Sequence, residues 1–207
     1  MKMIDQLNQA HRELINGERK TVTLSRHYDA EVADVWQACT DADRLARWFM
    51  PVSGDLRLGG TYQLQGNAGG QILRCEPPSL LKISWLYGPD PGFSEVEVRL
   101  AAKDGGTLLE LVHTAEVPPE FWSRFGPGSV GVGWDLSLLG LAMHLAGSPK
   151  VDEERFHLTE EGRAFIVGSA TAWSRAHGAA GAPQDAVAAT LAETIAFYAP
   201  QPDQETP

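Results

Sequence analysis

The chain has 207 residues, of which 43% are hydrophobic and 21% are charged, the proportions of a folded globular protein. It holds 17 basic and 27 acidic residues, a formal net charge of −10, and its lysines and arginines are scattered along the sequence. This balance argues against a nucleic-acid-binding groove and against a partner membrane with an anionic surface. The length is sufficient for one domain with a full core and an appendage.

Residues 1–18 form a polar leader with charges throughout, which is unlike the apolar segment of a signal peptide. Four of its residues have helical spacing, but the segment is too short and polar to form a stable helix alone. The rest of the chain has no apolar run of the roughly 18 residues that a membrane span needs. We therefore expect a cytoplasmic protein. The residues at helical spacing are Leu7, His11, Leu14 and Ile15.

The first regular elements follow the leader. Residues 21–28 alternate between apolar and polar side chains and predict a strand. A short amphipathic helix is expected next, and its apolar face carries Val32, Val35, Trp36 and Cys39. A second helical turn holds Leu45 and Trp48, and Asp41 can cap its start.

Glycine and proline turns divide the next sixty residues into strands. Together with residues 21–28 they give about seven strands joined mostly by short turns, which predicts a mainly antiparallel sheet. These strands are expected at 54–58, 61–65, 71–76, 80–87, 93–102 and 107–114.

The pattern becomes helical from residue 130 to 146. Gly147 and Pro149 end this helix, whose length of about 17 residues corresponds to roughly 25 Å, enough to lie across a curved sheet. Its apolar stripe consists of Val130, Trp134, Leu138, Leu141 and Leu145. Two further helices are expected at 158–177 and 185–198. This pair is too small to hold a core alone, so it must pack on the main domain or on another subunit.

In this order the elements resemble the helix-grip fold of the START/Bet-v-1-like (SRPBCC) superfamily. Within it, the chain is similar to the family named for the activator of the heat-shock-protein-90 ATPase, homologue-like. The resemblance covers about residues 19–147. It is carried by Arg26 in the first strand, Val35-Trp36, Leu45 with Trp48, 55–60 (DLRLGG), Glu76-Pro-Pro, 83–85 (ISW), 106–113 (GTLLELVH) and 133–139 (GWDLSLL).

The resemblance implies an α+β fold in which a curved antiparallel sheet of about seven strands wraps a long C-terminal helix. Two short helices follow the first strand, and a C-terminal helical pair is added. The chain then divides into a leader at 1–18, a helix-grip domain at 19–147, a helical extension at 148–199 and a flexible tail at 200–207. The segment 126–133 is unusually rich in glycine, and we expect it to loosen the start of the long helix and to widen or mobilise the cavity mouth.

Such a fold encloses a cavity, and many aromatic residues, Phe125 among them, fall where the fold would aim them inward. Each one alone is more simply explained as core, but together they favour a lined cavity, because one helix cannot fill a strongly curved sheet. The ligand-binding candidates are Trp48, Phe49, Tyr62, Gln71, Trp85, Tyr87, Phe93, His113, Phe121, Trp134, Leu138 and Leu141.

His113 is the candidate for catalysis. It shares strand parity with Leu109 and Leu111 and so points to the apolar side, and the family pattern places a histidine there. At a cavity mouth it could orient an acidic or carbonyl ligand or act as a base. Alternatively, it is a core histidine bonded to the backbone or to a tryptophan. Arg26 is either another inward polar group or a paired structural residue.

No metal or cofactor is expected. The other histidines form no HxxxH or HxH pair, and Cys39 and Cys75 lack ligand spacing and are expected to be reduced core residues. The sequence contains no GxSxG, GxxxxGK[ST] or GxGxxG motif. The other histidines are His11, His27, His144, His157 and His177.

Three functions are consistent with these features. The first is binding of a small hydrophobic or aromatic molecule in an internal cavity. The second is an enzyme of the polyketide-cyclase or aromatase type, as some superfamily members are, with His113 assisted by Tyr87 or Arg26. The third is a chaperone-type or stress-response protein-interaction module that uses the negative surface and the C-terminal helices. Those helices could instead form a homodimer. The sequence leaves open whether any reaction is catalysed.

Overall fold

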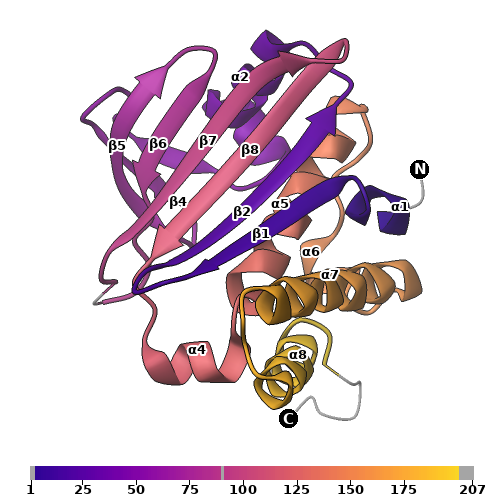
Figure 1. Cartoon of the computed structure of the whole chain (residues 1–207). Coiled ribbons are helices and arrows are strands. Elements are labelled where there is room, and N and C mark those ends of the chain that lie inside the picture. Colours follow the sequence, from indigo (N-terminus) through magenta and orange to yellow (C-terminus); the bar gives the residue numbers. More distant parts are fainter. Residues whose placement is uncertain (1–2, 90, 201–207) are drawn as a thin grey trace.

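The structure is a computed structural model that describes residues 3–89 and 91–200, apart from the side chains of residues 153 and 154. One antiparallel sheet of eight strands, in the order β1-β2-β8-β7-β6-β5-β4-β3, curves around helix α5 (Figure 1). The strands are β1 (Ala10–Asn16), β2 (Lys20–Tyr28), β3 (Val52–Gly54), β4 (Thr61–Leu64), β5 (Gly69–Glu76), β6 (Leu80–Ser84), β7 (Ser94–Lys103) and β8 (Gly106–Ala115).

Eight helices accompany the sheet in the described part of the chain. They are α1 (Met3–Leu7), α2 (Val32–Thr40), α3 (Ala42–Trp48), α4 (Pro119–Phe125), α5 (Gly128–Leu145), α6 (Glu153–Phe156), α7 (Glu160–Ala179) and α8 (Gln184–Tyr198). The α+β helix-grip fold predicted from the sequence is confirmed. Within residues 3–89 and 91–200, no helix has the length and apolar character to cross a membrane.

The core lies between the concave face of the sheet and α5. Strand β2 alternates as its sequence predicts, so that Val22 and Leu24 point inward and are buried. Leu139 and Leu141 of α5 and Val35 of α2 meet them. Burial of each such side chain contributes about 1.5–3 kcal/mol. The long helix is therefore apolar around most of its circumference.

The two short helices after β2 are confirmed. The Asp41 carboxylate accepts a hydrogen bond from the backbone N–H of Arg44 at 2.9 Å and caps α3 as predicted. The Trp48 indole N–H donates to the Ala38 carbonyl at 2.9 Å and so ties α3 to α2. These bonds hold α3 at its start and at its last residue, and the residue after it, Phe49, forms part of one wall of the site.

The leader differs most from expectation. Residues 10–16, where the spacing suggested a weak helix, form the edge strand β1, which pairs with β2 from Ala10↔Arg26 to Asn16↔Lys20. The same residues also alternate: Arg12 and Leu14 are half-buried, whereas His11 and Glu13 are exposed. The sequence fits both a helical and an alternating period, and pairing with β2 selects the strand. The sheet therefore has eight strands instead of about seven.

Two smaller differences lie elsewhere. The strand expected at 54–58 is β3, Val52–Gly54, and residues 55–60 form a turn in which Arg57 pairs with Asp55 at 2.7 Å. Helix α4 was not predicted. From residue 201 onward, the tail predicted to be flexible lies outside the described residues.

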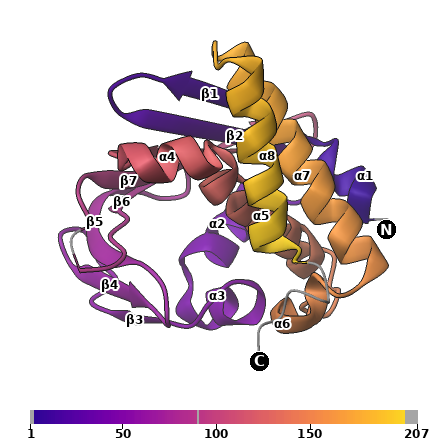
Figure 2. The same ribbon diagram turned by 90° about the horizontal axis from the view of Figure 1, so that it is seen from below.

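The C-terminal helices pack on the main domain, one of the two arrangements expected for them. Helix α7 lies on α5, and α8 lies along α7 and beside α4 (Figure 2). Trp173 of α7 is fully buried against Gly131, where an added Cβ would lie 2.3 Å from Trp173 Cε2. At Gly128 it would lie 2.5 Å from Thr194 Oγ1.

These close approaches correct the interpretation of the segment 126–133. Its glycines do not loosen the start of α5, which is helical from Gly128. They form a flat surface that lets Trp173 and Thr194 approach the helix backbone.

A buried polar cluster joins the same elements. Asp135 of α5 is 2% exposed and accepts hydrogen bonds from Arg12 Nη2 at 2.7 Å, Ser169 Oγ at 2.5 Å and Trp173 Nε1 at 3.0 Å. One carboxylate thus connects the edge strand, the long helix and α7. Removing one partner of the Arg12–Asp135 ion pair would strongly destabilise the fold, because the remaining charge would stay buried.

Arg26 lies beside this cluster and is buried. Its guanidinium donates to the Gln6 side chain and lies 5.0 Å from the Tyr28 ring centroid, and burial lowers its pKa. Its Nε has no acceptor among the described residues. Of the two roles considered for Arg26, the structure shows a packed structural residue outside the cavity described below.

Candidate functional site: an aromatic chamber

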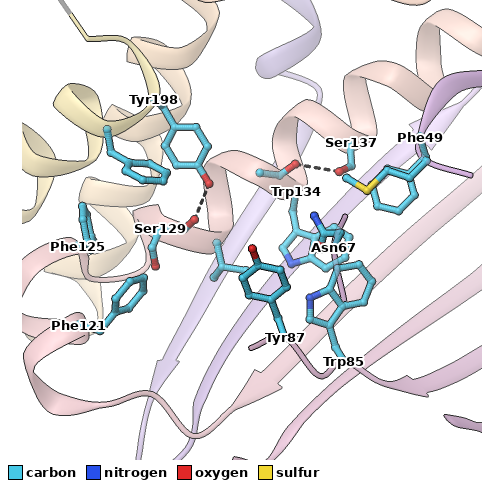
Figure 3. Close-up of a pocket in the computed structure, with 14 residues that line it drawn as sticks. Phe49, Asn67, Trp85, Tyr87, Phe121, Phe125, Ser129, Trp134, Ser137 and Tyr198 are labelled. Carbon is cyan, nitrogen blue, oxygen red and sulfur yellow. Dashed lines mark hydrogen bonds between the residues drawn. The ribbon is translucent and has the colours of Figure 1, made fainter. Parts of the chain in front are cut away.

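A chamber of about 430 Å³ opens at the end of the sheet where α3, α4, α5 and α8 meet (Figure 3). Six parts of the fold supply its walls: the end of α3, the turn between β4 and β5, the segment after β6, and helices α4, α5 and α8. It is lined by Phe49, Met50, Asn67, Trp85, Tyr87, Phe121, Phe125, Ser129, Val130, Gly133, Trp134, Ser137, Phe197 and Tyr198.

Eight of the lining residues are aromatic, and several contact each other. The ring centroids of Trp85 and Trp134 are 4.9 Å apart. On the opposite wall, Phe125 lies 5.0 Å from Phe121 and 5.6 Å from Phe197. Tilted and edge-to-face pairs of this kind are favourable and hold the rings in defined positions. The chamber therefore offers fixed aromatic surfaces on two sides.

The polar groups of the wall are few and uncharged. The Ser137 hydroxyl donates to the Gly133 carbonyl at 2.9 Å and the Ser129 hydroxyl to the Gly126 carbonyl at 3.2 Å, so both oxygens keep lone pairs for a ligand. The side-chain oxygen of Asn67, Oδ1, accepts a hydrogen bond from the backbone N–H of Ala68 at 2.7 Å, which leaves the side-chain NH₂ group as a donor for a ligand. Of the described residues that line the chamber, none is charged.

Tyr198 closes one side of the chamber. Its hydroxyl donates to the Ser129 carbonyl at 2.5 Å, and burial raises its pKa to about 12. Tyr198 is therefore neutral at physiological pH, and the bond holds the end of α8 against the start of α5. Figure 3 shows this bond and the Ser137 bond at the chamber wall.

His113 lies behind the chamber wall. The Trp134 indole N–H donates to His113 Nδ1 at 3.1 Å, and Nε2 is 2.8 Å from Ser94 Oγ. Because an indole nitrogen can only donate, the proton of the neutral imidazole is on Nε2 and is directed at Ser94. Burial lowers the pKa of His113 to about 4. This matches the second alternative considered above, a core histidine bonded to a tryptophan, which here positions Trp134.

The structure brings five of the twelve predicted ligand-binding residues together around the chamber and places seven elsewhere. The five are Phe49, Trp85, Tyr87, Phe121 and Trp134. His113 borders another pocket of about 170 Å³ between β8 and the 115–122 segment, which shares Trp85, Tyr87, Ser129 and Val130 with the chamber wall. Leu138 and Leu141 are core residues, and the Trp48 indole is bonded to the Ala38 carbonyl. The half-buried Phe93 ring lies under Arg19, 3.6 Å from its guanidinium carbon.

Gln71 points away from the interior for an identifiable reason. Alternation counted back from Cys75 would place it inside, but the register of β5 shifts between Ile72 and Arg74. This irregularity turns Ile72 inward and Gln71 outward, where its amide donates to the Gly59 carbonyl at 2.9 Å.

A second, smaller cavity of about 140 Å³ lies between α2, α3 and strands β3 to β6. Phe49 and Trp85 line both cavities. Burial raises the pKa of the Cys39 thiol to about 12, so this cysteine stays protonated. The other lining residues, which include the predicted Tyr62, are mostly aliphatic: Cys39, Thr40, Leu45, Val52, Leu56, Arg57, Tyr62, Leu64, Ile72, Cys75, Leu81 and Ile83.

The sequence analysis missed the contribution of α8 to the chamber. Its visible signal is the aromatic pair Phe197-Tyr198 at the end of an otherwise alanine-rich helix. Ser129 and Ser137 were also missed, because serines on a helix give no pattern that separates a cavity wall from a surface. Among the described residues, no group of three or more potential metal-ligating side chains comes together.

Known proteins share this architecture. The family model described as activator of Hsp90 ATPase homolog 1-like protein matches residues 29–146. The crystal structure of CalU16 from Micromonospora echinospora is 38% identical, with 79% of this chain and 97% of that chain covered and a TM-score of 0.61. Its solution structure gives 37% identity, 83% and 97% coverage and a TM-score of 0.65. The comparison with curated proteins gave no match.

More distant structures share the fold alone. DynU16, described as a putative protein in the dynemicin biosynthetic locus, is 22% identical, with 64% of this chain and 50% of that chain covered and a TM-score of 0.57. The family match ends at residue 146, before α7 and α8 begin. The match over more than half of the chain, together with the resemblance to CalU16, shows that this helix-grip protein belongs to the activator of Hsp90 ATPase homolog 1-like family.

Proposed function

We propose that the protein binds a small, uncharged aromatic molecule in the chamber of about 430 Å³. The observation that carries this proposal is the composition of the wall: eight aromatic side chains and three small polar ones, with no charge among the described lining residues. Small-molecule sites of 300–1,000 Å³ are commonly built this way, with apolar walls and a few polar groups that fix orientation.

The wall also limits the chemistry of the ligand. A charged group would lose its hydration without gaining a partner of opposite charge, which is costly. A flat aromatic ring can instead pack against the fixed faces of Trp85 and Trp134. Hydroxyl or amine groups at its edge can donate to Ser129 and Ser137, and a carbonyl can accept from the Asn67 NH₂ group.

The relatives support a small-molecule role in general terms only. DynU16 is described as belonging to the biosynthetic locus of dynemicin, and that description concerns DynU16. It is consistent with a small-molecule role for a protein of this fold.

Binding is favoured over proton-transfer catalysis by the surroundings of His113. Both imidazole nitrogens are engaged within the protein, and a pKa of about 4 makes this group a weak base near neutral pH. A cyclase-type reaction through His113 has no comparable support. A homodimer through the C-terminal helices stays a prediction; because Trp173 and Phe165 pack within the same chain, it would use the exposed residues of these helices.

The proposal can be tested with 6-acetyl-2-dimethylaminonaphthalene, a neutral fluorescent molecule whose emission responds to burial. We expect saturable binding to the full chain, and Ser137→Phe, which fills the chamber from α5, should weaken it at least tenfold. Ser123→Phe on the exposed face of α4 is the matched control and should bind like the parent. If Ser137→Phe folds and binds as tightly as the control, the chamber is not the binding site.

A further inference from the structure

We propose that the aromatic chamber and the second cavity of about 140 Å³ form one bipartite site, and that the ligand carries a short, uncharged alkyl or acyl chain on its aromatic ring system. The rings would occupy the chamber and the chain would enter the second cavity between Phe49 and Trp85. This inference rests on the proposed function and adds the class of ligand.

The first reason is the contrast between the two linings. The chamber is dominated by aromatic faces, whereas the second cavity is lined mainly by aliphatic side chains and two cysteines. Apolar cavities of about 150 Å³ stay dry and accept molecules the size of benzene. The second cavity thus has the size and chemistry for a few methylene groups, and a polar head would find few partners there.

The second reason is that the two spaces share their dividing wall. Trp85 and Phe49 line both, and in Figure 3 they lie on the same side of the chamber. Trp85 is held by its contact with Trp134 at 4.9 Å between ring centroids. Phe49 is half-buried, and its ring contacts Trp48 at 5.4 Å.

The backbone of Phe49 is fixed by hydrogen bonds at the end of α3. Its N–H donates to the Leu45 carbonyl at 2.8 Å, and its carbonyl accepts from Lys150 Nζ at 2.6 Å. A change of side-chain rotamer at this one residue would widen the passage between the two spaces without moving α3. Such changes are common when ligands bind to otherwise preformed sites.

The charge near the second cavity lies at its rim. Arg57 contributes to the lining, but its side chain is 80% exposed and its guanidinium pairs with Asp55 at 2.7 Å. The aliphatic stem of such a side chain can cover apolar surface while the charge remains in water. A carboxylate or ammonium at the end of the chain is therefore not required, and an uncharged chain fits the interior.

The irregularity of β5 places two residues of this strand at the second cavity. Ile72 and Cys75 are an odd number of residues apart, yet both line it, because the register shifts between Ile72 and Arg74. Cys75 is the smaller of the two, so a bulky residue at this position would fill the space. Leu73 belongs to the opposite face of the same strand and is exposed, which makes it a matched control position.

The test measures dissociation constants for 6-acyl-2-dimethylaminonaphthalenes with acetyl, butyryl and hexanoyl chains. In the parent protein each buried methylene should tighten binding about fourfold, so the butyryl compound should bind about fifteenfold more tightly than the acetyl compound. In Cys75→Phe the acetyl compound should bind as in the parent, and the gain for butyryl should fall below about threefold. Leu73→Phe should keep the full gain.

The outcomes separate the two proposals. If the acetyl compound does not bind, both fail. If it binds but chain length brings no gain in the parent, or brings the same gain in Cys75→Phe as in Leu73→Phe, the bipartite site is wrong and the aromatic chamber stands. Should Cys75→Phe fail to fold, Val52→Phe fills the same cavity from the edge strand β3 and is judged by the same comparison.

Discussion

Replacing Gly131 with alanine tests whether the glycines of α5 form a packing surface. The new Cβ would lie 2.3 Å from Trp173 Cε2 and 2.5 Å from Nε1. Trp173 is fully buried, and its indole N–H is bonded to Asp135 at 3.0 Å, so the ring cannot move aside without losing that bond. Overpacking of this kind costs about 1–3 kcal/mol. Alanine gains about 1 kcal/mol over glycine inside a helix, which offsets only part of this cost.

We expect Gly131→Ala to lower the free energy of unfolding by up to about 2 kcal/mol, or the melting temperature by up to about 8 °C for a chain of this length. Gly133→Ala is the matched control, because its Cβ would meet only the Tyr198 hydroxyl at 3.3 Å. It should be neutral or up to about 1 kcal/mol more stable. Urea unfolding followed by tryptophan fluorescence measures both. Equal stability of the two variants would refute the packing role of Gly131.

Three further predictions concern other parts of the molecule. Asp135→Ala leaves the buried Arg12 without its charged partner and should lower the free energy of unfolding, measured in urea, by about 3–5 kcal/mol. The double variant Asp135→Leu with Arg12→Met should recover much of this loss. A loss below about 1 kcal/mol in Asp135→Ala would contradict the prediction. His113 has a pKa near 4 in the folded protein and about 6.5 in the unfolded chain. Above pH 6.5 the imidazole is neutral in both states and the protein keeps its full stability. As the pH falls from 6.5 to 4 the unfolded chain takes up the proton first, and the free energy of unfolding drops by about 3 kcal/mol. His113→Gln should lack that part of the pH dependence, and identical profiles would count against it. Phe197→Ala removes one aromatic contact of the chamber and should weaken binding of the 6-acetyl-2-dimethylaminonaphthalene compound about two- to tenfold. An unchanged dissociation constant would contradict this prediction.

Much of the fold could be predicted from local patterns. Alternation and turn residues located most strands, and the apolar stripe from Val130 to Leu145 located the long helix. Residues 10–16 could not be assigned, because their side chains fit a helical period and an alternating one, and only pairing with β2 decides. The role of Gly131 was also hidden: glycine in a helix suggests flexibility unless the facing residue, Trp173, is known.

The candidate site was less predictable than the fold. Five of the aromatic residues predicted near strand ends and on the long helix line the chamber, since the resemblance to the helix-grip fold fixes which elements meet at the opening. Gln71 was misplaced by a one-residue irregularity that reverses the faces of β5. Phe197 and Tyr198 were missed because their position depends on how α8 packs, which follows from long-range contacts with Gly128 and Ser129.

The contribution of α8 to the chamber has a consequence for ligand preference. The region matched by the family model, residues 29–146, supplies one part of the wall, and a separate segment beyond it supplies Phe197 and Tyr198. Phe197 is 65% exposed and takes little part in the core. Under the proposed function, substitutions at the tip of this helix would change ligand preference while leaving the residues that fold the sheet untouched.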